Sequence, residues 1–397
     1  MTPTTSECTP AAFREHFPML TRKVHLASCS LGARSSAVDD ATLSMLDHMA
    51  DGGAPWDLFE QQVFEARAQF ATLIGARTDQ IAVVPNASIG AYQVASTMDW
   101  SRRSGVVTTT MEFPSVAHVW LAQRPRGARV VHARTAEEYA DLIDRGTRLV
   151  SVPLTTYRDA VRLPVADIAR IAHARGADVF VDAYQAVGVE PVDVELLGCD
   201  YLVAGTMKYL LGLPGLAFLY VRSPELTDRK PRLTGWFGRV DPFAFDPMTL
   251  DFAAAATRFE TGTPAIPACY AANAGLRLIG GLDLNAVRKH VSDLTDLAVE
   301  RLSELGEQVR APQSDRRGAH IGLVDADAVA LSRFLADRDI VVSPRGDLVR
   351  LSFHYYSNTE DVTALCAAVA SHRSTRGGRP HRTEPMTSRV VGRSVHS

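Results

Sequence analysis

The central part of the chain alternates short apolar runs with amphipathic helical segments, and this alternation constrains the fold more than any other feature. Each apolar run has the length of one strand, and the runs lie at residues 105–111, 148–154, 178–182, 201–204 and 215–221. Residues 165–175, between two of these runs, carry apolar side chains at helical spacing. The pattern predicts an α/β fold with a mostly parallel sheet and helices on both faces. The short connection from residue 210 to residue 221 predicts one antiparallel neighbour.

The pattern of apolar and polar residues changes near residue 276. Residues 284–305 and 328–338 have helical periodicity, and short apolar runs follow the second of them. We therefore expect an N-terminal segment, a large α/β domain, a small α+β domain and a tail, at residues 1–24, 25–275, 276–371 and 372–397. The tail is rich in Arg, Gly, Ser and Pro. We expect it to be disordered, because it buries too little apolar surface to offset the entropy lost on ordering.

Charge and composition argue against several classes of function. With 42 Lys and Arg against 45 Asp and Glu, the chain has no excess of cations for the phosphates of a nucleic acid. No apolar run reaches the roughly 18 residues that a membrane span needs, and the N-terminus has no signal-peptide pattern. The 5 cysteines are scattered without a CxxC pair, so neither a disulfide framework nor a metal site is expected. We expect a cytoplasmic protein.

Two charged residues follow neighbouring buried strands. Asp182 ends the run 178–182, and Lys208 follows the run 201–204 among apolar residues. The carboxyl ends of parallel strands form the ligand crevice of such sheets, and a charge buried there is costly unless it is paired or used. A structural ion pair is therefore the alternative to a functional pair. The remaining lysines lie in polar surroundings, at Lys23, Lys230 and Lys289.

A desolvated lysine can form a Schiff base with an aldehyde, and a carboxylate can hold a proton on a pyridine nitrogen. Lys208 and Asp182 are therefore typical of a catalytic pair that works with pyridoxal 5'-phosphate (PLP). Gln185, three residues after Asp182, is placed to donate a hydrogen bond to the phenolic oxygen of the cofactor.

The stretch from Val181 to Val221 resembles the aminotransferase class V group of fold-type I PLP enzymes, which includes cysteine desulfurases, kynureninases and isopenicillin N epimerase-like proteins. It has the strand-ending Asp, the Gln three positions later, a Gly-x-Asp at residues 198–200 and the Schiff-base Lys before a Gly- and Pro-containing turn. The resemblance covers residues 25–361. It implies a three-layer αβα large domain, the PLP cofactor and a homodimer with shared active sites.

The resemblance implies three further cofactor contacts that come from the same subunit as Lys208. A strand, a turn and a helix start at residues 83–90 offer a helix N-terminus to the phosphate, with Ala87 and Ser88. A plain N-cap role for Ser88 is the alternative. Phe113 stands where the family places a ring over the cofactor face, unless it is a core residue. Thr206 takes the role of a His that cysteine desulfurases place before the lysine.

Other segments carry the remaining site residues. Residues 258–264 resemble the family's RFxTGTP element, in which Gly262 and Thr263 would reach the PLP phosphate of the neighbouring subunit. The kynureninase-like segment around Trp236 adds a cofactor contact. Arg350 matches the family's arginine for the substrate carboxylate, with a structural role as the alternative. Ser30 lies in a segment that resembles the entry loop of kynureninase-like enzymes, and we expect it at the substrate.

The departures from the family pattern are also informative. Cysteine desulfurases need a cysteine on the loop before the carboxylate arginine, because a thiolate must accept the sulfur, and residues 340–349 contain none. Cys29 is the nearest rival and is expected to pack. Where the family has an Asn, this chain has a segment ending in Arg158, which either contacts an unusual substrate or is a solvated loop residue.

These observations predict a PLP-dependent lyase or transferase that acts on a small α-amino acid. We favour a C–S β-lyase that cleaves a cysteine S-conjugate by β-elimination in specialised metabolism, such as antibiotic biosynthesis. Transamination, epimerisation, kynureninase-type hydrolysis and decarboxylation coupled to oxidation remain open. A non-catalytic binding protein on the same fold is the alternative from a different class. Neither a nucleic acid nor a membrane is expected as a partner.

Overall fold

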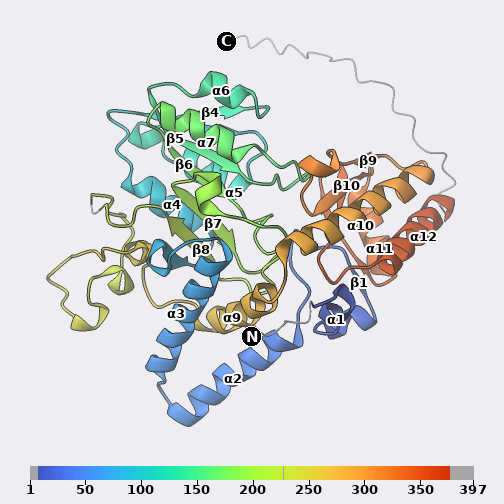
Figure 1. The fold of residues 1–397 in the computed structure, drawn as a ribbon, viewed down its shortest axis with the longest axis horizontal. Helices are drawn as coiled ribbons and strands as arrows, with labels where there is room; N and C mark the ends of the chain where they lie inside the picture. The colour runs from blue at the N-terminus through green and yellow to red at the C-terminus, as the bar shows by residue number, and fades with distance from the viewer. Residues whose placement is uncertain (1–7, 227, 376–397) are drawn as a thin grey trace, which may run out of the picture.

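The structure is a computed structural model that describes residues 8–226 and 228–375. A seven-stranded sheet lies at the centre of its large part, in the order β2-β8-β7-β6-β5-β3-β4 (Figure 1). The strands are β2 (Ile81–Val84), β3 (Gly105–Thr109), β4 (Arg129–Ala133), β5 (Thr147–Pro153), β6 (Asp178–Asp182), β7 (Tyr201–Gly205) and β8 (Ala217–Val221). Strands β4, β3, β5, β6 and β7 pair in parallel, whereas β8 runs antiparallel to both of its neighbours. The predicted mostly parallel sheet and its antiparallel strand are confirmed.

Helices cover both faces of this sheet. One face packs against α3 (Trp56–Leu73), α6 (Glu138–Leu142), α7 (Val165–Ala174), α8 (Val194–Leu197) and α9 (Ile266–Gly280). The other face packs against α4 (Ala87–Thr97) and α5 (Pro114–Leu121). In β6, Val179 and Val181 belong to the first core and Phe180 to the second, as the two-residue repeat of a strand requires. Burial on both faces explains why these strands are continuous apolar runs in the sequence.

A second sheet, of four antiparallel strands, lies beside the first and comes from the C-terminal part of the chain (Figure 1). Its order is β12-β13-β10-β9, with β9 (Val309–Arg310), β10 (His320–Val324), β12 (Ser343–Arg345) and β13 (Leu348–Ser352). Helices α10 (Leu284–Glu304), α11 (Ala328–Ala336) and α12 (Thr359–Thr375) pack against it around a separate core. The small α+β part expected after residue 276 is present.

The N-terminal residues pack against this second unit. Strand β1 (Val24–His25) pairs in parallel with β11 (Ile340–Val341), and Phe13 of α1 (Pro10–Arg14) belongs to the same core. Helix α2 (Ser36–Gly52) then crosses to pack on α9. Short 3-10 helices complete the elements: η1 (Pro18–Thr21), η2 (Thr78–Gln80), η3 (Arg124–Arg126), η4 (Trp236–Gly238), η5 (Pro242–Ala244), η6 (Ala256–Phe259) and η7 (Ser314–Arg316).

The last described helix is longer than the sequence suggests. Helix α12 continues through Thr375, past the predicted start of the tail at residue 372. Buried His372 packs on the ring of Phe334, and Arg373 forms ion pairs with Glu307 and Asp325 at 2.7 and 2.6 Å. These contacts stabilise the last turn of the helix. Residues 1–7 of the predicted N-terminal segment and residues 376–397 of the predicted tail lie outside the described residues.

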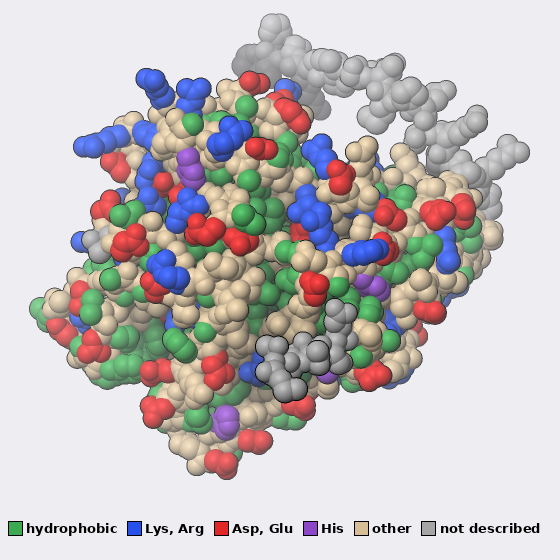
Figure 2. Space-filling view, in the orientation of Figure 1, with side chains coloured by type: hydrophobic (Ala, Val, Ile, Leu, Met, Phe, Trp, Pro, Cys, Tyr) green, Lys and Arg blue, Asp and Glu red, His purple; other side chains and the backbone are tan. Residues whose placement is uncertain are grey.

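The surface mixes charges of both signs on the face shown in Figure 2. Large apolar side chains are exposed at several places among the described residues, including α2 and α3. One such segment is residues 233–250, which Figure 1 shows as the yellow loops beside the central sheet: Leu233, Val240, Phe243, Phe245, Met248 and Leu250. Among the helices of the described residues, none is both long and apolar enough to cross a membrane.

Candidate active site

A pocket of about 180 Å³ opens where the carboxyl ends of β5 and β6 meet the second sheet. It brings together residues that lie far apart in the sequence, from the N-terminal loop to β13. Eight of the residues expected from the sequence line it: Ser30, Ala87, Ser88, Phe113, Asp182, Gln185, Lys208 and Arg350. The pocket is therefore the candidate active site.

Asp182 and Lys208 reach the pocket from adjacent strands. Strand β6 pairs in parallel with β7, so Asp182 at the end of β6 and Lys208 just beyond β7 lie at the same edge of the sheet. Both side chains are buried, at 7% and 8% exposure. Asp182 Oδ1 accepts a hydrogen bond from the Tyr184 N–H at 2.9 Å. No ion pair joins the two residues among the described ion pairs, so the structural alternative is not what holds them here.

Aromatic rings surround the lysine amine. Lys208 Nζ lies 4.2 Å from the ring centre of Tyr184 and 5.5 Å from that of Phe113. Phe113 in turn meets Tyr157 edge to face, with 5.2 Å between the ring centres. Burial therefore lowers the pKa of Lys208 to about 8, although the Asp182 carboxylate opposes this shift. A substantial fraction of the amine is neutral, and hence nucleophilic, close to neutral pH.

A second buried carboxyl group lies near Asp182. Burial, with the neighbouring charge of Asp182, raises the pKa of Glu112 to about 8. Glu112 accepts hydrogen bonds from the Phe113 N–H at 2.9 Å and from Ser151 Oγ at 3.1 Å. Burial also raises the pKa of Asp182, while the Tyr184 N–H and Lys208 oppose the change. Sequence reasoning missed Glu112, although a Glu directly before Phe113 was the available signal.

The start of α4 forms another wall of the pocket. Asn86 is the N-cap of this helix, because its Oδ1 accepts a hydrogen bond from the Ile89 N–H at 3.0 Å. The alternative N-cap role of Ser88 is therefore wrong. Ala87 and Ser88 are the first helical residues, and N–H groups at these positions have no partner within the helix. They line the pocket and provide a site for an anion.

Arg350 brings a buried positive charge to the pocket from β13. Its side chain is 1% exposed, and it donates from Nη1 to the Tyr157 carbonyl oxygen at 2.6 Å and from Nη2 to Ser343 Oγ at 2.9 Å. Nε has no hydrogen-bond partner, and no carboxylate pairs with Arg350 among the described residues. Two neutral acceptors hold the guanidinium in place and leave its charge unbalanced. This arrangement suits an anionic group of a ligand.

These residues fit the cofactor expected from the sequence. Gln185 donates from Nε2 to the Cys29 carbonyl oxygen at 3.1 Å, and its buried Oε1 has no hydrogen-bond partner in the described part of the chain. The buried acid in this pocket matches the ring nitrogen of PLP, and the buried amine matches its aldehyde. The helix N-terminus matches the phosphate, and the aromatic ring matches the face of the cofactor. No group of three or more His, Cys, Asp or Glu suited to a metal ion occurs within the described residues.

Five residues expected at the site do not line this pocket. Thr206 is buried, and its Oγ1 donates to the carbonyl oxygens of Leu213 and Leu216, so it stabilises the turn after the lysine. Arg158 forms an ion pair with Asp347 at 2.5 Å.

The other three lie away from the pocket as well. Trp236 belongs to an aromatic cluster with Trp56, Phe237, Phe243 and Phe245. Gly262 and Thr263 are exposed. Their expected partner is the cofactor of a neighbouring subunit, so their role stays a prediction.

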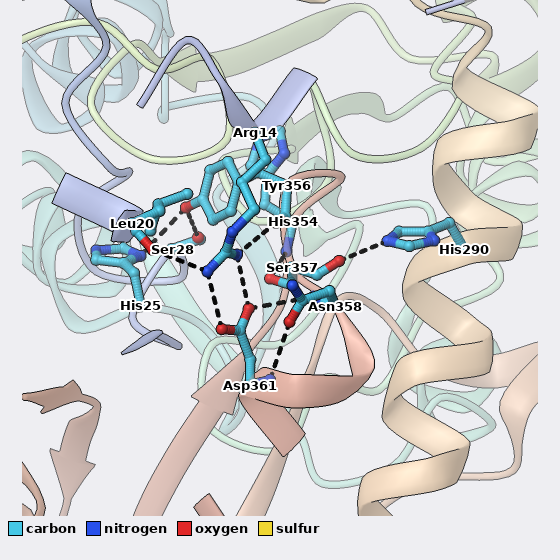
Figure 3. A network of polar contacts seen from close by, with 10 residues as sticks. All are labelled: Arg14, Leu20, His25, Ser28, His290, His354, Tyr356, Ser357, Asn358 and Asp361. Carbon is cyan, nitrogen blue, oxygen red and sulfur yellow. Dashed lines mark hydrogen bonds and ion pairs between the residues drawn. The ribbon is translucent and has the colours of Figure 1, made fainter. Parts of the chain in front are cut away.

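A network of polar contacts fixes the loop that carries Cys29 and Ser30 (Figure 3). The Tyr356 hydroxyl shares a hydrogen bond with Ser28 Oγ at 2.7 Å and lies 3.1 Å from His25 Nδ1. Below it, Arg14 pairs with both oxygens of Asp361, at 2.9 and 3.1 Å. The network therefore joins the N-terminal helix, the pocket loop and the start of α12.

The same network reaches the residue after the lysine. His354 Nε2 lies 3.0 Å from the Tyr209 carbonyl oxygen, and His354 Nδ1 accepts a hydrogen bond from the Tyr355 N–H at 2.7 Å. Burial lowers the pKa of His354 to about 4, so the ring is neutral near pH 7 and its Nε2–H donates to Tyr209. This contact fixes the backbone next to Lys208.

Two glycines hold the lysine loop by close backbone contact. A Cβ atom on Gly32 would lie 2.3 Å from the carbonyl oxygen of Lys208, and one on Gly275 would lie 2.1 Å from that of Leu210. The Gly32 N–H also donates to the Met207 carbonyl oxygen at 2.8 Å. The loop is therefore confined from the N-terminal segment on one side and from α9 on the other.

The chain matches a known protein family along most of its length. The family model "Aminotransferase class-V" matches residues 55–365. The chain is 37% identical to the "Uncharacterized aminotransferase YcbU" of Bacillus subtilis, over 91% of this chain and 98% of that protein. It is 28% identical to the kynureninase of Pseudomonas fluorescens, over 83% of this chain and 84% of that protein.

Solved structures show the same fold. An apo cysteine desulfurase from Thermococcus onnurineus superposes with a TM-score of 0.84 at 21% identity, covering 94% of this chain and 100% of that one. The cystine C-S lyase C-DES, in complex with cysteine persulfide, gives 0.82 at 21% identity, with coverage of 89% and 99%.

The first prediction concerns the packing of the lysine loop. Gly275→Ala should lower the free energy of unfolding by about 1–3 kcal/mol, because the new methyl group overlaps a backbone atom that cannot move alone. Gly280→Ala is the matched control on the same helix, since its Cβ would meet nothing within 4 Å. Urea unfolding monitored by fluorescence measures both. Equal stability of the two variants would contradict the close packing.

The second prediction concerns the acidity of Lys208. The rate at which cofactor-free protein captures PLP should rise with pH and level off above about 8, because only the neutral amine attacks an aldehyde. Stopped-flow absorbance over a pH series measures this rate, and borohydride reduction followed by peptide mapping identifies the lysine. A midpoint at the ordinary lysine value of 10.5 would mean that the amine is not desolvated.

Proposed function

The chain belongs to the aminotransferase class V family of PLP enzymes, which act on amino acids, and we propose that this member is a C–S β-lyase. Its substrate is a cysteine S-conjugate, and its products are a thiol, pyruvate and ammonia. The observation that carries the proposal is the loop before Arg350. This loop forms part of the pocket wall and presents Arg345 there, with no cysteine between residues 340 and 349 to take up sulfur.

The residues that line the pocket would hold the cofactor in one orientation. Asp182 would bind the ring nitrogen, Ala87 and Ser88 would bind the phosphate, and Phe113 would cover the ring. When bound, PLP supplies an aldehyde that joins covalently to an amine and a ring that withdraws electrons from the substrate α-carbon. Burial raises the pKa values of Asp182 and Glu112, because a charged carboxylate is poorly solvated in this pocket. The positive charge of a bound pyridinium nitrogen would stabilise the ionised form of Asp182.

The chain's own groups then carry out the proton transfer. Arg350 binds the α-carboxylate and fixes the orientation of the α-carbon. Lys208, with its pKa near 8, is neutral often enough to accept the α-proton as general base. The rings of Phe113, Tyr157 and Tyr184 line the pocket and limit the access of water. Loss of the α-proton and of the β-thiolate, followed by hydrolysis, gives the three products.

Hydrolysis of a kynureninase-type substrate is the second candidate. The observation that favours it is the pair Phe113-Pro114 beside the lysine, together with the identity of 28% to a kynureninase. Transamination, epimerisation, oxidative decarboxylation and a non-catalytic binding role stay open as alternatives from the sequence. The cytoplasmic location and a role in specialised metabolism also stay predictions.

We also propose a homodimer with shared sites. The exposed apolar side chains of residues 233–250 form a surface that a second copy of the chain would bury. The exposed pair Gly262 and Thr263 lies near this segment in the fold, because a Cβ on Gly235 would meet the Thr261 carbonyl oxygen at 2.4 Å. Light scattering after size-exclusion chromatography tests the dimer, and a monomer at all concentrations would overturn it.

The third prediction concerns the reaction. With S-alkyl cysteines the holoenzyme should release thiol, pyruvate and ammonia in equal amounts. Lys208→Ala should lower this rate by about 10²–10⁴-fold or more, because it removes the general base as well as the cofactor anchor. Lys230→Ala, at an exposed lysine, is the control and should keep the wild-type rate. Cleavage of kynurenine without any release of thiol would favour the second candidate.

The fourth prediction concerns Arg350. Arg350→Ala should raise the KM for the S-conjugate by about 10–150-fold, which corresponds to the loss of one charge-assisted hydrogen bond. Arg170→Ala, on the exposed face of α7, provides a control for the lost charge. Steady-state kinetics measure both variants. An unchanged KM for Arg350→Ala would remove this residue from the substrate site.

A further inference from the structure

The β12–β13 hairpin brings a second arginine to the pocket that contains Arg350. Arg345 ends β12 and lines the pocket, where it is more exposed than the fully buried Arg350. The hairpin pairs Ser343 with Arg350 and Arg345 with Leu348, so both arginines are carried by one short antiparallel ladder. Sequence reasoning treated residues 340–349 only as a loop without cysteine, and it did not single out Arg345.

Arg345 has no counter-charge among the described residues. Its hydrogen bond joins Nη1 to the carbonyl oxygen of the adjacent Pro344, at 2.8 Å. The nearest carboxylate in the sequence is Asp347, two residues away. Asp347 is already bound by Arg158 at 2.5 Å and by Arg310 at 3.0 Å. Two other arginines therefore bind the carboxylate of Asp347. Arg345 lies beside the pocket and has no ion-pair partner among the described residues.

The charges on the pocket do not balance without a ligand. Lys208, Arg345 and Arg350 contribute positive charge to its lining, whereas Asp182 is the acidic residue of that lining. Burial is the main cause that lowers the pKa values of Lys208 and Arg345. The charge of Arg350 lowers both further, and the charge of Arg345 adds to the effect on Lys208, so the three groups interact electrostatically. A single substrate carboxylate on Arg350 would leave Arg345, which is exposed at the pocket, solvated by water and without an anionic partner.

We propose that Arg345 binds a second anionic group of the substrate, on the part that leaves with the sulfur, so that the enzyme selects cysteine S-conjugates with an acidic S-substituent. This inference rests on the proposed C–S β-lyase activity for the position of the acid in the substrate. The α-carboxylate occupies Arg350, which neutral acceptors fix in place. The distal acid occupies Arg345, which is held only by its own chain and is free to close on it.

The test compares two nearly isosteric substrates, S-(2-carboxyethyl)-cysteine and its neutral amide S-(2-carbamoylethyl)-cysteine. The wild-type holoenzyme should have a kcat/KM about 10–150-fold higher for the acid, as expected for one charge-assisted hydrogen bond. Arg345→Gln should reduce this ratio to about 1, chiefly by raising the KM of the acid. A change in the acidity of Lys208 affects both substrates alike and therefore cancels in the ratio. Arg338→Gln changes the net charge equally at an arginine that stacks on Phe334 and should keep the wild-type ratio.

A binding measurement separates this inference from the proposed reaction. Titration of the holoenzyme with each compound, followed by the absorbance of the cofactor, gives a Kd whether or not the C–S bond breaks. Tighter binding of the acid in wild type but not in Arg345→Gln, without release of thiol, would support the selectivity and overturn the lyase activity. Equal Kd and kcat/KM for acid and amide in wild type, with thiol released from both, would overturn the role of Arg345 and leave the lyase activity standing.

Discussion

The burial of one amine at the edge of a parallel sheet is the constraint on which the rest of the structure depends. Lys208 lies among aromatic rings and forms no ion pair with any described residue, and burial lowers its pKa to about 8. Such a position is unfavourable for a charged lysine, and the protein maintains it by confining the loop. The close approach of Gly32 and Gly275 and the contact of His354 with Tyr209 leave the lysine backbone little freedom.

The pocket also contains ionisable side chains whose charges have no ion-pair partner among the described residues. Asp182 and Glu112 are both buried, burial raises the pKa of each, and the charge of Asp182 raises that of Glu112 further. Arg350 and Arg345 carry positive charge with no carboxylate partner among the described residues. A folded protein tolerates such groups where a ligand supplies the missing charges. A pyridinium ring beside Asp182 and carboxylates on the two arginines would balance the charges of the pocket. The cofactor and an acidic substrate would therefore both complement the pocket electrostatically.

Sequence reasoning identified the parts of the site that follow strand ends or family motifs. Asp182 and Lys208 were predictable because consecutive parallel strands place their carboxyl ends together, and Arg350 matched a motif of the family. Thr206 and Arg158 were expected at the ligand, but the structure uses the first to close a turn and the second to bind Asp347. Glu112 was missed although it directly precedes Phe113, and Arg345 was missed because nothing in the local sequence shows that it lines the pocket.

The sequence by itself therefore determined the fold-type I architecture, the family and the cofactor, since apolar periodicity and spaced motifs are local properties that survive without coordinates. Only the tertiary structure decided which charges are balanced. Whether Asp347 pairs with Arg345 or with Arg158 and Arg310 depends on how residues nearly two hundred positions apart meet across the hairpin. Pairing over such distances is set by the packing of the whole chain. For that reason the chemistry of a site can be predicted from its motifs, whereas its selectivity cannot.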